Sequence, residues 1–228
     1  MPKNRIEGLS DKVFVIILTI LIIKINLPQL NLSFAITDSR LWEELAKLGP
    51  ILLSYLVSFA VISTFWVFHS SFYSIFSNNR TDRILAQLNT VFLAALAIIP
   101  FSTDFIRNSP GAGTAIALYG ISVLVIAIIA RIMLSVAIRT EALGNDVDAD
   151  TFKKMYKQAS TRGWLNLISI MVGIGFAFFP SLIFLSYIFF TLPVMFNIIP
   201  GIVSKLRGSP KDKTSMRTIA VNRAPDLG

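Results

Sequence analysis

Long apolar runs separated by polar stretches recur along the chain and predict a bundle of membrane-spanning helices. A bilayer core requires about 20 apolar residues of helix, and most of the runs reach that length. The expected helices cover residues 5–27, 44–71, 81–100, 113–138, 164–179 and 181–199. Residues 139–162 are polar and are expected to form a loop. Residues 1–203 thus form one six-helix domain, and residues 204–228 form a basic, polar tail that we expect to be disordered.

The first of these segments differs from the others because its apolar part is short. Residues 13–23 are apolar except for Thr19, and 11 residues of helix extend only about 17 Å, against about 30 Å of hydrocarbon. Polar residues must therefore lie at the membrane edges, with Ser10 and Asp11 at one end and Lys24 at the other. Such groups are costly there unless they face protein or water. We therefore expect this helix to line a path for something polar.

Composition supports an all-α integral membrane protein. The chain is 54% hydrophobic and 15% charged, with a mean hydropathy of +0.68, whereas soluble domains carry about 25% charged residues. It contains no cysteine, one histidine and 13 carboxylates, which leaves little material for a metal cluster or a catalytic group. We expect neither an enzyme nor a cofactor. The net charge of +8 is typical of basic membrane loops and does not require a nucleic-acid partner.

The distribution of basic residues predicts the orientation of the chain. An even number of helices places both termini on one side of the membrane. Sixteen lysines and arginines lie on that side, four lie on the opposite side, and Arg131 lies within the fourth helix. Because basic loops face the cytoplasm, both termini are expected to be cytoplasmic.

The polar entry of the first helix needs partners within the protein. The end of the second helix runs antiparallel beside it and carries Trp66 and His69, three positions apart and therefore on one face. We predict a buried network of the residues Arg5, Ser10, Asp11, Trp66 and His69. The favoured interpretation is a clamp that fixes the first helix, and the alternative is a gate sensitive to pH or a ligand. His69 has no second ligand of a suitable type for a metal site.

The centre of the first helix carries a regular stripe. Ile16, Thr19, Ile20, Ile23 and Leu27 recur at helical spacing, and Lys12 continues the stripe towards the cytoplasm. Core packing would explain this periodicity equally well, but the polar ends of the helix favour a pore. Apolar rings can gate a pore by dewetting, and rings of oxygen atoms can replace the water around an ion. In that case Lys12 and Leu27 lie at the two mouths of the pore.

We expect two residues of the third helix to have structural roles. Asn89 lies within an apolar run, so we expect it to bond a neighbouring helix. Pro100 is expected to end the helix, because proline cannot continue the hydrogen-bond ladder in a helix interior.

The sequence Arg5-Ile6-Glu7-Gly8-Leu9-Ser10-Asp11 resembles the Arg-x-x-x-Phe-Ser-Asp signature of a known family. That signature opens the first helix in prokaryotic relatives of transmembrane protein 175, the lysosomal potassium channel. The similarity spans all six expected helices, and the residues that continue it are Val13, Phe14, Thr19, Trp66, His69, Asn89, Pro100, Phe101, Leu118 and Tyr119.

The resemblance implies a homotetramer of six-helix subunits in a prokaryotic plasma membrane, with the first helices lining a central pore and no re-entrant filter loop. It implies a constriction at Ile16, further aliphatic rings at Ile20 and Ile23, and a hydroxyl layer at Thr19 that contributes to potassium selectivity. K⁺ would be the permeant ion. The clamp of Arg5, Ser10, Asp11, Trp66 and His69 would hold the helices together.

Three residues depart from the family pattern. Leu9 replaces the signature phenylalanine, Lys12 replaces a small residue, and Lys24 replaces a common acidic residue near the outer mouth. Rings of lysine would repel K⁺ unless the side chains turn away from the pore. The leading hypothesis is a passive, potassium-selective channel. The rival is a secondary transporter or proton-coupled exchanger using Asp11 and His69, although the two halves of the chain share no obvious repeat.

Overall fold

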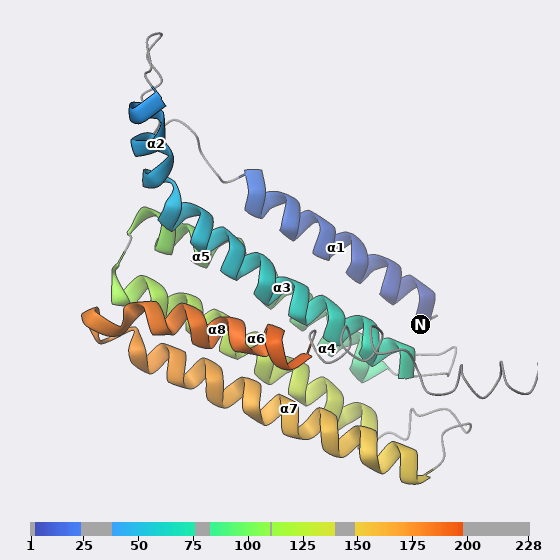
Figure 1. The fold of residues 1–228 in the computed structure, drawn as a ribbon. Helices are drawn as coiled ribbons and strands as arrows, with labels where there is room; N and C mark the ends of the chain where they lie inside the picture. The colour runs from blue at the N-terminus through green and yellow to red at the C-terminus, as the bar shows by residue number, and fades with distance from the viewer. Residues whose placement is uncertain (1–2, 24–37, 76–82, 110, 140–148, 198–228) are drawn as a thin grey trace, which may run out of the picture.

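The computed structural model describes residues 3–23, 38–75, 83–109, 111–139 and 149–197, and these residues are helical apart from short turns. Most of the helices run side by side, with α1 at one edge and α7 at the other, while α2 points away from the bundle (Figure 1). The elements are α1 (Lys3–Ile23), α2 (Asp38–Lys47), α3 (Gly49–Ile75), α4 (Arg83–Leu96), α5 (Ile99–Asn108), α6 (Gly113–Arg139), α7 (Ala149–Phe176), the 3₁₀ turn η2 (Pro180–Leu182) and α8 (Ile183–Asn197).

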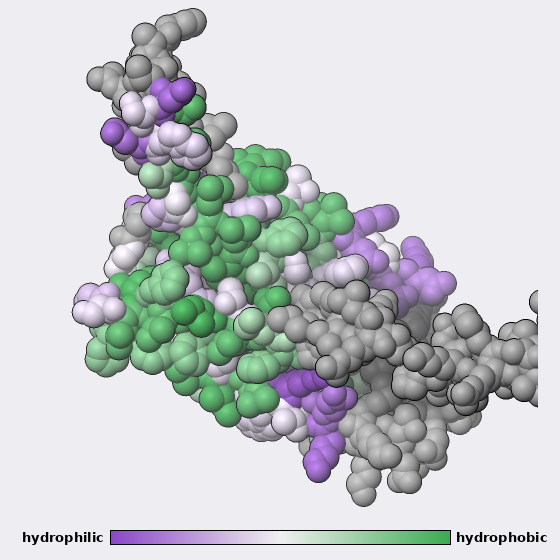
Figure 2. All heavy atoms as spheres, viewed as in Figure 1, coloured by the Kyte–Doolittle hydropathy of each residue, from purple (hydrophilic) through white to green (hydrophobic). Residues whose placement is uncertain are grey.

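Three segments are long and apolar enough to cross a membrane, namely Gly49–Tyr73, Arg83–Asn108 and Gly113–Ile138, and Pro180–Phe196 is a shorter apolar helix. Figure 2 shows a broad apolar band across one face of the molecule, with hydrophilic residues at α2 and at the opposite end of the helices. This distribution is typical of a protein whose middle lies in hydrocarbon and whose ends lie in water.

Helix α6 forms the centre of the core because it packs against α4, α5 and α7. Apart from Ala115 and Ala117 near its start, its buried side chains recur at spacings of three and four, which keeps them on one face of the helix. They are Ile116, Tyr119, Val123, Ile126, Ala130, Met133 and Ala137. Helix α1 is attached differently, since it packs mainly against α3 and more lightly against α4 and α5.

The expected third helix does not end at Pro100. A break falls at Ala97 and Ile98 instead, and α5 then continues to Asn108. Pro100 is the second residue of α5, where the missing N–H has no helical partner to lose. The backbone bridges the break, because the N–H of Ser102 donates to the carbonyl of Ile98 at 3.0 Å. The proline therefore restarts the helix rather than terminating it.

Two other expected boundaries also differ. The second helix was expected over 44–71, but α2 ends at Lys47 and α3 begins at Gly49 and extends to Ile75. The prediction of a loop over residues 139–162 is wrong from Ala149 onward, because α7 begins at that residue. Its first turns are polar, and a polar helix end is stable where it projects into water. The expected tail over 204–228, together with Lys24 and Leu27, lies outside the described residues.

The N-terminus of α6 lies unusually close to the end of α7. A Cβ atom added at Gly113 would lie 2.1 Å from the backbone oxygen of Ala177, which is too close for any side chain. We expect Gly113→Ala to force the two helix ends apart and to lower the free energy of unfolding by about 1–3 kcal/mol. The matched control is Gly175→Ala, because a Cβ there meets nothing within 4 Å and should be neutral or stabilising. Thermal unfolding in detergent micelles measures both, and equal melting temperatures would contradict the close contact.

Candidate functional site

A buried chain of hydrogen bonds joins α1, α3 and α4. Asn89 on α4 donates from its Nδ2 to the Oγ of Ser10 on α1 at 3.0 Å, and its Oδ1 lies 2.9 Å from Nε2 of His69 on α3. An amide oxygen can only accept, so Nε2 of His69 carries the hydrogen. Ser10 in turn donates to the carbonyl of Ile6 at 2.8 Å. We call this set, His69, Asn89, Ser10 and the Ile6 carbonyl, the polar relay.

Aromatic rings surround the imidazole of the polar relay. The ring centroid of His69 lies 4.7 Å from that of Tyr73, 5.7 Å from that of Phe14 and 6.0 Å from that of Phe92. Ser10, His69 and Asn89 are each at most 2% exposed. A polar group in such an environment is costly unless it is hydrogen-bonded, so the relay fixes the relative positions of three helices.

A second, more exposed link lies beside the relay. The indole Nε1 of Trp66 donates to Oδ1 of Asp11 at 3.4 Å, and Trp66 is 46% exposed. This distance exceeds the usual N–H···O distance of about 2.9 Å, so the link is weaker than those in the relay. Arg5 is exposed, and no hydrogen bond or ion pair among the described residues joins it to Ser10, Asp11, Trp66 or His69. Four of the five residues expected in the network thus lie at the α1–α3 contact, in two separate links.

Asn89 bonds neighbouring helices as expected, but sequence reasoning did not place it between Ser10 and His69. Its position within an apolar run indicated a bond to a neighbouring helix. However, the run is nearly uniformly apolar, so the rotation of the helix about its axis could not be deduced. The structure turns Asn89 towards both α1 and α3, which makes it the residue that connects Ser10 to His69.

Helix α1 buries only one narrow stripe of side chains, and the candidate pore residues lie outside it. The buried residues are Ile6, Ser10, Phe14, Ile17 and Leu21. Ile16, Ile20 and Ile23 are 56%, 40% and 71% exposed, and Lys12 and Thr19 are exposed as well. In a membrane protein, such side chains must contact lipid, another subunit or an internal water path.

The Thr19 hydroxyl is oriented so that its hydrogen bonds α1 and its oxygen can still accept. Its Oγ1 donates its hydrogen to the carbonyl of Val15, one turn back, at 2.7 Å. A hydroxyl that donates to its own helix keeps its lone pairs available as acceptors. Thr19 therefore presents an oxygen that can coordinate a cation. Among the described residues, no cluster of His, Asp or Glu side chains is suited to hold a resident metal ion.

Comparisons with known proteins match the part of the chain that contains this site. Residues 5–100 match the profile of a family described as the endosomal/lysosomal potassium channel TMEM175. That range begins at Arg5 and includes the whole polar relay.

Individual relatives and one solved structure extend the match. A potassium channel of Chryseobacterium sp. is 26% identical over 179 residues, which cover 78% of this chain and 84% of that protein. A potassium channel of Streptomyces collinus is 32% identical over 130 residues, which cover 55% and 60% of the two chains. The crystal structure of a lysosomal potassium-selective channel TMEM175 homolog from Chamaesiphon minutus aligns with a TM-score of 0.58 and 26% identity, covering 84% of this chain and 97% of that one. The chain is therefore a multi-pass membrane protein that is similar to bacterial potassium channels and whose residues 5–100 match the TMEM175 family.

Proposed function

We propose that this chain is a potassium-selective cation channel that conducts K⁺ passively through a pore lined by α1. The observation that carries the proposal is the division of α1 into two sides. One stripe packs into the subunit through the polar relay, while Ile16, Ile20 and the Thr19 oxygen remain exposed. The names of the Chryseobacterium and Streptomyces relatives, both potassium channels, support the same activity.

A pore formed by α1 requires several copies of the chain, because one helix cannot enclose a path. The family resemblance implies four subunits, each with six membrane-spanning helices and both termini in the cytoplasm of a prokaryote. Helix α1 has 21 residues, or about 32 Å of helix, which is enough to cross about 30 Å of hydrocarbon. Around a central axis, the isoleucines of neighbouring copies would form stacked apolar rings.

These rings give the pore a gate and a selectivity layer in our proposal. Ile16 would form the narrowest ring and would close the pore by excluding water. Thr19 lies three residues further along, about 4.5 Å, and would offer oxygen atoms to an ion that has passed that ring. Lys12 lies at the cytoplasmic end of the same side of α1, where its long stem allows the ammonium group to reach water.

Flux measurements on the reconstituted protein test this function. Purified protein in liposomes loaded with K⁺ should release K⁺ passively and much faster than Na⁺, without coupling to a proton gradient. Flux that saturates at low turnover or moves protons in exchange would contradict the channel and favour the transporter hypothesis. The structure gives the transporter little support, because Asp11 bonds Trp66 while His69 bonds Asn89, so the two groups belong to separate links.

Replacing Thr19 by valine tests the selectivity layer. Valine has the same shape but lacks the hydroxyl oxygen that would replace water around the ion. We expect Thr19→Val to reduce the ratio of K⁺ to Na⁺ permeability at least severalfold, as measured from reversal potentials in planar bilayers. The matched control is Thr90→Val on α4, since Thr90 is also exposed and also bonds the carbonyl one turn back. An unchanged permeability ratio in Thr19→Val would show that this hydroxyl does not select ions.

A further inference from the structure

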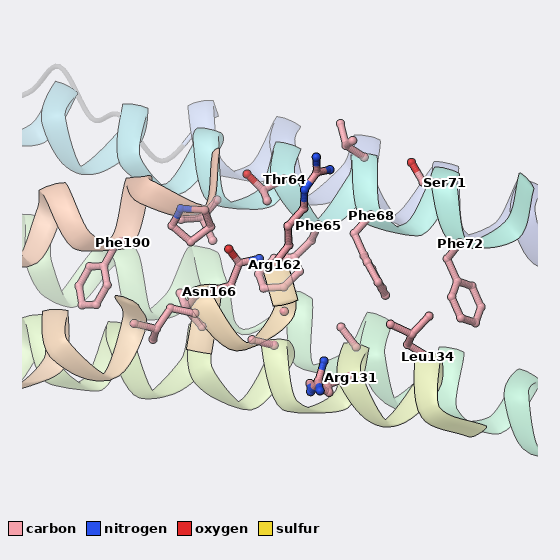
Figure 3. A pocket seen from close by; sticks show the side chains of 18 residues that line it. Thr64, Phe65, Phe68, Ser71, Phe72, Arg131, Leu134, Arg162, Asn166 and Phe190 are labelled. Carbon is pink, nitrogen blue, oxygen red and sulfur yellow. The ribbon is translucent and has the colours of Figure 1, made fainter. Parts of the chain in front are cut away.

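A cavity of about 220 Å³ opens between α3, α6, α7 and α8, away from α1 (Figure 3). Its walls are mainly apolar, and Phe68 and Phe72 project from α3 towards Leu134 of α6. Arg131 on α6 and Arg162 on α7 also line it, with their side chains on different sides of the cavity. The described residues that line the cavity include no aspartate or glutamate.

Neutral groups hold Arg131 in place. Its Nη1 and Nη2 donate to the backbone oxygen and the Oγ of Ser160, both at 3.2 Å. Its guanidinium also lies 4.6 Å from the ring centre of Trp164. These contacts orient the group but do not neutralise its charge, and no carboxylate of the described residues pairs with Arg131 or Arg162. The cavity therefore carries two positive charges without a described counter-ion.

The two arginines lie near one end of the membrane-spanning region. Arg131 precedes the end of α6 at Arg139 by eight residues, about 12 Å along the helix. Trp164 stacks on it, and tryptophan is enriched at the interface between lipid and water. By the orientation proposed above, this is the cytoplasmic end. Arg162 lies where the polar turns of α7 meet its apolar part at Trp164, so the charged part of the cavity lies at the edge of the hydrocarbon, with apolar lining residues on both sides of it.

We propose that this cavity binds an anionic phospholipid, with the phosphate at Arg162 and part of one acyl chain along the apolar wall that includes Phe65 and Phe68. A planar guanidinium group can bind two oxygens of one phosphate at once. Basic pockets between membrane helices on the cytoplasmic side are suited to acidic headgroups. The volume is below the roughly 300–1,000 Å³ of a pocket that encloses a whole drug-sized ligand. A lipid would therefore insert only a segment of one chain and leave the rest in the bilayer.

Native mass spectrometry of the full chain in detergent tests the proposal. The protein is titrated with phosphatidylglycerol, with phosphatidylcholine of the same acyl chains, and with inorganic phosphate. We expect saturable binding of phosphatidylglycerol, and much weaker binding of both phosphatidylcholine and free phosphate. Equal binding of the two lipids would overturn the proposal. Phosphate binding as tight as that of phosphatidylglycerol would overturn it too, because the site would then be one for a free anion.

Variants localise the binding to the cavity. Arg162→Gln should weaken phosphatidylglycerol binding about fivefold, as expected for the loss of one cation near a headgroup. The matched control is Arg83→Gln, an exposed arginine at the start of α4 outside the cavity, which should bind the lipid normally. Ala127→Leu keeps both arginines but narrows the apolar part, and it should also weaken binding. If Arg83→Gln weakens binding as much as Arg162→Gln, or if Ala127→Leu binds normally, the lipid does not occupy this cavity.

Discussion

Replacing Ile16 by asparagine is expected to raise the basal K⁺ flux at least tenfold. In the proposed pore, a ring of isoleucine side chains closes the path by excluding water, and a ring of amides would hold water instead. A shift of only about 1.4 kcal/mol between the dry and wet states of the whole ring changes their ratio tenfold. Burial of a single isoleucine side chain is worth about 1.5–3 kcal/mol. Replacing a complete ring therefore changes the free energy between the dry and wet states by more than the roughly 1.4 kcal/mol required. Liposome flux and single-channel recording both measure the change.

The control for this variant is Val15→Asn. Val15 is 62% exposed and adjacent in sequence to Ile16, but it lies about 100° further around the helix. It therefore lies outside the proposed Ile16 ring, on the side of α1 that carries Thr19 one turn further along. An asparagine at Val15 should leave the basal flux near that of the unmodified protein. If both variants leak equally, or if Ile16→Asn does not leak, Ile16 does not form the constriction.

The second large effect is expected at Asn89. Replacing it by leucine keeps the branching and the number of side-chain heavy atoms but leaves the Nε2–H of His69 without its acceptor in an aromatic pocket. An unsatisfied buried donor costs about 1–3 kcal/mol, and Ser10 also loses a bond from Asn89. We expect Asn89→Leu to lower the free energy of unfolding by an amount at or above that range. Thermal unfolding in micelles measures the loss.

Two further variants separate this explanation from general damage to α4. Thr90→Val changes an exposed neighbour on the same helix, and it should alter stability by no more than about 0.5 kcal/mol. Combining Asn89→Leu with His69→Phe removes both partners of the bond, which can be nearly neutral when shape is kept. The double variant should therefore be more stable than Asn89→Leu alone. If Asn89→Leu is as stable as Thr90→Val, the relay does not hold the helices together.

Hydropathy alone predicted where most of the apolar helices lie, because a span of sufficient length must be apolar whatever it packs against. It could not predict the helical start of α7 at Ala149, since charged helical turns in water carry no apolar signal. The expected role of Pro100 was also wrong, because proline ends a helix when it lies in the interior but is tolerated in the first turn. Only the tertiary structure tells which of these positions the proline occupies.

The candidate site could be predicted in part for a related reason. Ser10, Asp11, Trp66 and His69 are polar groups at two helix ends that must be neighbours, so their proximity followed from topology. Their pairing did not, because it depends on how each helix is rotated about its axis. The side of α1 that stays exposed could not be predicted for the same reason, since the sequence of a helix that is apolar all around does not indicate which stripe it buries.

The polar relay makes distant residues energetically dependent on one another. No hydrogen bond among the described residues joins Ser10 directly to His69, yet each hydrogen-bonds the side chain of Asn89. Removing either partner leaves half of the amide unsatisfied and lets it turn, which weakens the remaining bond. The stability losses of Ser10→Ala and His69→Phe should therefore not add, and the double variant should lose less than the sum by about 0.5 kcal/mol or more. A double-mutant cycle between these two helices would thus measure a coupling that is transmitted entirely by a side chain on a third.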